Sequence, residues 1–204
     1  MVSLRLLLAS VWLPSYVQKS EVDRVAAMTT DSLRSVLEEE APSELQKVST
    51  EIKTPSGSIE RRRAVMAANH SLLLKALSDG VGRDRAVELG REALFNVGVS
   101  LGEDSRRRLG VGDSVEDLLT AARLMYGVLG ISFTVKEECG DHHMEVHRCA
   151  LSEHYSELTC TVLSAVDEGV FRGLNPRASM SFERRITSGF PTCTACIRIA
   201  PGGT

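Results

Sequence analysis

Residues 131–149, ISFTVKEECGDHHMEVHRC, decide the fold class of this 204-residue chain. Within them Ile131, Phe133 and Val135 alternate with polar residues. A period of two residues is typical of a strand that has one buried and one polar face. The chain therefore contains a sheet, although the residues before this stretch follow a helical period.

The next residues predict a hairpin. Gly140-Asp141 has the composition of a two-residue turn that joins antiparallel strands. Counting from this turn places Val135 opposite Val146 on the apolar face and Lys136 opposite Glu145 on the polar face. Like pairs with like on one face and opposite charges pair on the other, which favours this register.

Helices are predicted on the N-terminal side of the hairpin. Apolar residues recur there every three or four positions, which indicates helices over 21–40, 59–80, 86–101 and 115–129. Ser114 is expected to cap the last of these helices. The polar residues 53–58 read as a linker, so we expect an N-terminal helical extension over 1–52 and a main domain over 59–199.

The C-terminal part adds a helix over 152–171 and two more strands. Met180, Phe182 and Ile186 alternate in a third strand, and a fourth extends from Cys193 to Ile199. The predicted fold is α+β, with a helical layer packed on one face of a four-stranded, mainly antiparallel sheet.

Composition excludes several classes of function. The net charge of −3 and the pI near 6.0 do not provide the positive surface that a nucleic-acid-binding protein needs. The apolar run over 1–13 resembles a signal sequence, but Arg5 interrupts it and no cleavage site follows, so we interpret it as a buried or docking helix. Five cysteines do not form a disulfide framework, and we expect a cytoplasmic protein with free or metal-bound thiols.

Four cysteines in the last third of the chain are the strongest functional lead. They are Cys149, Cys160 and the C-x-x-C pair Cys193 and Cys196. Thiolates bind zinc and iron–sulfur clusters, and His147 is expected on the same strand face as Cys149. Burial as small apolar side chains, or a redox or nucleophilic role, also explains these thiols.

Strand alternation limits the metal hypothesis. It places Cys196 on the polar side of the last strand and Cys193 on the apolar side. The sulfurs converge only if Cys193 and Cys149 lie at strand ends, where the pleat no longer sets their direction. On the preceding helix, Cys160 and Asp167 share one stripe beside the buried face. His70 is interpreted as a packed histidine.

Three short motifs carry a resemblance to a known family. They are GVGDSVEDLL (110–119), GLNP (173–176) and SGFPTC (188–193). Together with the order of helices, strands and cysteines, they resemble the L-2-amino-thiazoline-4-carboxylic acid hydrolase-like family over about 59–199. More distantly, the chain is similar to the vinyl-reductase type of small-molecule-binding domain. The resemblance implies recurring cysteines at Cys149, Cys160 and Cys193, whereas Phe190 stands where the family has an aspartate.

We therefore expect a small-molecule domain that bears zinc or an iron–sulfur cluster. As a hydrolase it would open a carbon–nitrogen or carbon–sulfur bond of a small heterocyclic acid, with Asp167 or Glu157 moving protons and Arg198 or Arg185 holding a carboxylate. The alternatives are a ligand-binding or metal- or redox-sensing module, and a helical interaction protein that uses residues 1–52. The expected partner is a small molecule, and we expect neither a nucleic-acid partner nor a membrane partner. The sequence is also compatible with a homo-oligomer.

Overall fold

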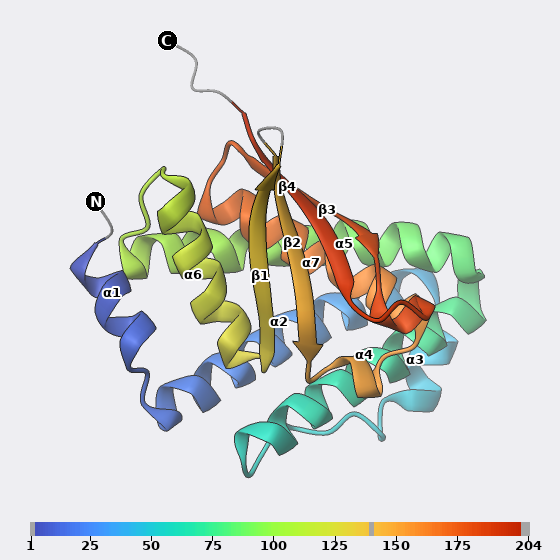
Figure 1. Cartoon of the computed structure of the whole chain (residues 1–204). Coiled ribbons are helices and arrows are strands. Elements are labelled where there is room, and N and C mark those ends of the chain that lie inside the picture. The colour runs from blue at the N-terminus through green and yellow to red at the C-terminus, as the bar shows by residue number, and fades with distance from the viewer. Residues whose placement is uncertain (1–2, 139–140, 201–204) are drawn as a thin grey trace.

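The computed structural model describes residues 3–138 and 141–200 (Figure 1). Helices make up the N-terminal part of the chain. Another long helix lies between the second and third strands along the chain. The α-helices of the described residues are α1 (Leu4–Val11), α2 (Ser15–Glu40), α3 (Pro42–Val48), α4 (Ile59–Val81), α5 (Arg83–Leu109), α6 (Val115–Val128) and α7 (Glu157–Leu174).

The sheet confirms the predicted α+β class. Its strands are β1 (Ile131–Glu138), β2 (Asp141–Cys149), β3 (Ala178–Arg184) and β4 (Cys193–Ile199), in the spatial order β1-β2-β4-β3. All three neighbouring pairs are antiparallel. The helices lie on one face, which we call the inner face, and the other face, the outer face, is turned toward the viewer in Figure 1.

The observed hairpin register differs from the prediction by two residues. Val135 lies opposite Met144 and Lys136 opposite His143, because Asp141 belongs to β2 and pairs with Glu138. Gly140, the other half of the predicted turn, lies outside the described residues. A shift of two leaves each side chain up to Val146 on its predicted face, so the pattern of buried and polar residues in this part of the hairpin was predicted correctly although the pairing was wrong.

A β-bulge near the end of β2 changes the direction of Cys149. Phe133 faces Val146 and Ser132 faces Arg148, so His147 is an extra residue on β2. The bulge turns Cys149 to the inner face, where it packs against the core. The prediction that His147 and Cys149 share the polar face is therefore wrong.

Two predicted element boundaries also change. The helix expected over 152–171 begins later, because Ser156 caps α7 by accepting a hydrogen bond from the Thr159 backbone, and Ser152–His154 forms a short 3₁₀ turn. Ile186 lies in a second 3₁₀ turn rather than in β3. The predicted cap at Ser114 is confirmed, since its side chain accepts from the Asp117 backbone.

Glycines allow α5 and α7 to approach closely. A Cβ atom added to Gly98 of α5 would lie 2.2 Å from the Val166 carbonyl oxygen, and one added to Gly169 of α7 would lie 2.2 Å from the Phe95 carbonyl oxygen. Gly102 and Gly173 make the equivalent contact one turn later. Only glycine fits where two helix backbones meet at this distance, so these residues determine where α7 lies.

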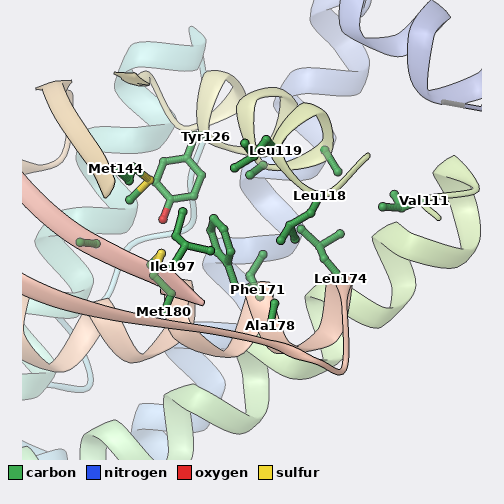
Figure 2. Close-up of a cluster of buried hydrophobic side chains, with 14 of the residues drawn as sticks. Val111, Leu118, Leu119, Tyr126, Met144, Phe171, Leu174, Ala178, Met180 and Ile197 are labelled. Carbon is green, nitrogen blue, oxygen red and sulfur yellow. The ribbon is translucent and has the colours of Figure 1, made fainter. Parts of the chain in front are cut away.

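The main core fills the space between the inner face, α6 and α7. Figure 2 shows Phe171 and Leu174 of α7 meeting Leu118 of α6 and Met180 of β3. Phe171 and Leu118 are fully buried. A second core joins α2, α3, α4, α5 and α7, and the space left between these cores contains the candidate site.

Candidate functional site

Two cavities meet inside the helical layer at Tyr126 and Asp167. The sheet-side cavity lies between α2, α4, α7 and the inner face, with a volume of about 90 Å³. The helix-side cavity lies between α2, α5, α6 and α7, with a volume of about 120 Å³. The residues that line both are Val25, Tyr126, Leu129, Val166 and Asp167.

The sheet-side cavity is the candidate site, because most of the polar side chains gather there. A water molecule needs about 10–15 Å³ of such volume, so this cavity has room for roughly six to nine water-sized groups by the same measure. That is the size of a substituted five- or six-membered ring. Its polar or thiol-containing lining residues are Thr29, His70, Tyr126, Cys149, Tyr155, Cys160, Ser164, Asp167 and Arg185.

Asp167 is the carboxylate at the centre of the site. Part of its surface faces the two cavities, but the surrounding protein removes most bulk water from the carboxyl group. This burial, together with the Glu168 carboxylate, raises the pKa of Asp167 from 3.8 to about 7, although the nearby Tyr126 hydroxyl and Arg185 charge oppose the shift. A carboxyl group with this pKa is present in both protonation states at neutral pH and is able to give or accept a proton.

Tyr126 places its hydroxyl beside the Asp167 carboxyl group at the junction of the two cavities. Its side chain is 3% exposed. Figure 2 shows the ring extending from α6 toward Met144 of the sheet. Burial raises the pKa of Tyr126, and the nearby Asp167 carboxylate adds to the shift. The hydroxyl therefore stays protonated and can donate a hydrogen bond to a ligand.

Arg185 provides an unused cationic donor. Its guanidinium lies over the Phe182 ring, 5.4 Å from the centroid, and Nη2 donates to Ser164 Oγ at 3.0 Å. The Nε atom is buried and has no hydrogen-bond partner among the described residues. A buried charged donor without a partner is costly, so this atom is placed to bind an anionic group of a ligand.

A hydrogen-bond network forms the far wall of the cavity. Thr29 Oγ1 donates to the Val25 carbonyl at 2.7 Å, which leaves its oxygen to accept from His70 Nε2, also at 2.7 Å. His70 Nδ1 then accepts from the Tyr155 hydroxyl at 2.8 Å. Burial lowers the pKa of His70 to about 3. The neutral histidine thus fixes the direction of the Tyr155 proton, which fits the predicted packing role of His70.

The thiols of the cavity are in the protonated form at neutral pH. Burial raises the pKa of Cys149 to about 11 and also raises the pKa values of Cys160 and Cys193. The thiolate is the form that attacks electrophiles and binds metals. In this environment Cys149 and Cys160 therefore act mainly as soft apolar lining.

The cysteines do not converge on one ion as the metal hypothesis required. Cys193 lies opposite Val146 on the inner face, whereas Cys196 lies opposite His143 on the outer face, and the His147 ring is within 2.8 Å of Thr134 Oγ1 on that outer face. Among residues 3–138 and 141–200, no group of three or more histidine, cysteine, aspartate and glutamate side chains is arranged to hold a metal. Cys196 and His147 therefore cannot join Cys193 in one ligand set.

The other predicted site residues divide between the two sides of the molecule. Asp167 and Arg185 line the sheet-side cavity. Glu157 lies on the surface, where it binds Arg83 at 3.2 Å, and Arg198 lies on the outer face, where its Nε donates to Asp141 at 3.0 Å. Neither Glu157 nor Arg198 lines the cavity.

Sequence reasoning missed the tyrosines and the threonine of this site. Tyr126 lies in α6 and Tyr155 follows the 3₁₀ turn Ser152–His154. Tyr155 was expected only to be buried. The signal in the sequence was a tyrosine hydroxyl within an otherwise apolar stripe, because a buried phenol usually needs a hydrogen-bond partner. Thr29 lies 41 positions from His70, so local spacing could not connect them.

Comparison with protein families identifies the chain. A family model described as L-2-amino-thiazoline-4-carboxylic acid hydrolase matches residues 61–197, which is more than half of the sequence. The chain belongs to this family. The match begins in α4 and ends in β4, so this hydrolase-family domain includes Asp167, Arg185 and the cysteines of the cavity. No curated protein sequence matches the chain.

Solved structures share the fold at low sequence identity. A trafficking protein particle complex subunit 3 from Naegleria fowleri, covalently bound to palmitic acid, has a TM-score of 0.51 and 11% identity, covering 68% of this chain and 95% of that one. The phenol-responsive sensory domain of the transcription activator PoxR, solved with phenol, has a TM-score of 0.50 and 19% identity, covering 65% and 74%. These similarities concern the fold alone.

Proposed function

We propose that the sheet-side cavity binds a small heterocyclic carboxylic acid of the thiazoline type and hydrolyses its ring. The observation that carries this proposal is that two features occur in one cavity. The Arg185 Nε has no hydrogen-bond partner among the described residues, and the carboxyl group of Asp167 has a pKa near neutrality. The guanidinium would bind the substrate carboxylate, and the size of the cavity suits one ring. Membership of the hydrolase family supports the reaction class.

The proposed reaction needs only the substrate and water. Water adds across the ring C=N bond, so that its hydroxyl joins the ring carbon between nitrogen and sulfur and Asp167 passes one proton from the water to ring nitrogen. The added hydroxyl then becomes a carbonyl as the bond from that carbon to ring nitrogen or ring sulfur breaks, and Asp167 transfers the hydroxyl proton to the leaving atom. Tyr126 would donate a hydrogen bond to a polar atom of the ring. No step is assigned to a metal, because the described residues do not provide its ligands.

Incubation of the purified chain with L-2-amino-thiazoline-4-carboxylic acid tests this proposal. We expect ring opening, followed by mass spectrometry as the addition of 18 mass units, the mass of one water. A thiol reagent would then distinguish the two bonds, since only cleavage to sulfur releases a free thiol. Binding without any addition of water would contradict hydrolysis.

Binding without chemistry is the second candidate, and the apolar walls of both cavities favour it. PoxR's sensory domain, which shares the fold, was solved with phenol. Under this alternative the chain would bind an apolar ring or chain, and Asp167 would serve as a buried hydrogen-bond donor. Calorimetric titration with phenol and with the thiazoline acid, beside the turnover assay, separates the two candidates.

A further inference from the structure

The outer side of α1 exposes an unusual concentration of large apolar side chains. Leu4, Leu7, Leu8 and Val11 are 71%, 46%, 64% and 85% exposed. Their spacing of i, i+3, i+4 and i+7 forms one stripe along the helix. Trp12, directly after α1, and Tyr16, at the start of α2, are also exposed, at 72% and 74%. Among the described residues, only Phe190 is another large apolar side chain with comparable exposure.

The stripe is displayed by a helix that is fixed to the protein. Leu6, on the opposite side of α1, is fully buried. Ser3 caps the helix by accepting from the Leu6 backbone, and its hydroxyl donates to the Leu109 carbonyl of α5. Figure 1 shows α1 at the edge of the molecule beside α6. A surface helix usually turns its apolar side inward, whereas α1 turns most of it outward.

The charged residues of α1 and of the groove beside it are positive. Arg5 is exposed and makes no ion pair with a described residue, and Arg123 of α6 lines the groove beside α1, also without an ion pair. Residues 3–20 contain no acidic side chain. The first one, Glu21, is bound by Arg24 and Arg108. A chain with a net charge of −3 therefore has two arginines without ion pairs among the described residues on or beside this apolar stripe.

We propose that α1, Trp12 and Tyr16 form a docking surface for an anionic lipid membrane. Leucine side chains together with tryptophan, tyrosine and unpaired arginines are the combination that binds the boundary between lipid headgroups and acyl chains. No helix of the described residues is long and apolar enough to cross a bilayer, so the contact would lie in the membrane plane. The expectation of no membrane partner considered only a spanning segment.

A second copy of this chain suits the surface less well. A two-fold contact through α1 would place the same positive side chains of both copies beside each other, and the stripe has no acidic residue to neutralise them. An anionic lipid surface satisfies the apolar stripe and the two arginines together.

The single tryptophan of the chain is a built-in reporter for the test. Trp12 fluorescence of the full chain should shift to shorter wavelength when phosphatidylglycerol vesicles are added, and partitioning should be at least tenfold weaker into phosphatidylcholine vesicles. The Leu4→Ser/Leu8→Ser double variant should reduce partitioning about tenfold or more. Arg5→Gln should reduce it about fivefold, the effect of one basic side chain near an anionic surface.

Phe190→Ser is the matched control, because it removes an exposed apolar side chain away from α1 and should leave partitioning unchanged. Circular dichroism verifies that each variant keeps its helix content. The proposal is overturned if phosphatidylglycerol vesicles do not shift the emission, or if both lipids bind equally. It is equally overturned if the emission shifts with protein concentration alone while gel filtration shows a dimer, since a second copy then covers α1.

Discussion

The inner and outer sides of the sheet contain the same kinds of residue in opposite states. On the outer face Arg198 is bound to Asp141, and the Cys196 thiol donates to the same carboxylate. On the inner side, the buried Nε of Arg185 has no hydrogen-bond partner among the described residues. The carboxyl group of Asp167 faces a cavity, and its pKa is raised. Residue type therefore does not identify a site. Enclosure and missing partners do, because water satisfies polar groups on an open face and cannot do so inside.

The largest expected difference between the two sides is in turnover. Asp167→Asn should lower kcat for ring opening about 10²–10⁴-fold, the usual contribution of a positioned acid or base. Asp141→Asn makes the same chemical change on the outer face and should keep kcat within about twofold, since exposed ion pairs contribute little. Steady-state assays of both variants measure the ratio. Equal rates for the two variants would remove Asp167 from the proposed reaction.

Enclosure of the inner side depends on the contact between α5 and α7. Gly169→Ala should lower the free energy of unfolding by about 3 kcal/mol or more, because its Cβ atom would lie 2.2 Å from the Phe95 carbonyl oxygen and the backbones would have to separate. Gly127→Ala in α6 meets nothing within 4 Å and should stabilise the protein by up to about 1 kcal/mol. Urea titrations compare the two variants. A neutral Gly169→Ala would mean that α7 moves freely.

The pH dependence of stability should also separate the two sides. Asp167 has a folded pKa of about 7, above its ordinary 3.8, so its favourable contribution is complete below about pH 4 and is lost as pH rises through 7. Asp167→Asn removes this loss. It should gain roughly 2–3 kcal/mol relative to wild type between pH 4 and pH 8, less than the full shift implies because cavity water solvates the carboxylate.

The wild-type profile alone will not reveal this effect. The pKa of His70 is lowered from 6.5 to about 3, so its contribution is complete above pH 6.5 and is lost as pH falls toward 3. The two slopes oppose each other between about pH 4 and 6.5, and the total changes little. The measurement is therefore the difference between Asp167→Asn and wild type in urea titrations at each pH, with Asp141→Asn as the control. A constant difference would show that Asp167 has an ordinary pKa.

The smallest expected effect concerns substrate binding. Arg185→Gln should raise KM roughly tenfold, because the charged hydrogen bond to the substrate carboxylate is lost. Its neighbour Arg184 lies over the Phe190 ring at 5.5 Å, and Arg184→Gln should leave KM unchanged. Titration with a methyl ester of the substrate, which lacks the carboxylate charge, should abolish the difference between wild type and Arg185→Gln. An Arg185→Gln variant with the wild-type KM would place the carboxylate elsewhere.

Local patterns predicted the elements of the fold well. The change of period at Ile131 indicated the sheet, and Ser114 marked the start of α6, because backbone periodicity and capping depend on neighbouring residues alone. The register of the hairpin was missed by two residues, since several turns near Gly140 satisfied the same alternation. The bulge at His147 was missed because an extra residue depends on the partner strand.

The candidate site was predicted in part. Asp167 and Arg185 were named from their residue types and the expected helix stripe. Glu157 and Arg198 were named on the same grounds, but the structure places them on other surfaces. Which arginine lacks a partner depends on residues far away in the chain, and no spacing rule contains that information.

The amino-acid sequence by itself determined the α+β class, the order of the elements, the inner side of the strands except at the end of β2, and the membership of the hydrolase family. Each of these follows from interactions between residues close in the chain or from motifs. Only the tertiary structure decided that a bulge turns Cys149 to the inner face, and that Tyr126, Asp167 and Arg185 surround one cavity. Burial and hydrogen-bond satisfaction are properties of the packed molecule, because they depend on which distant segments exclude water together.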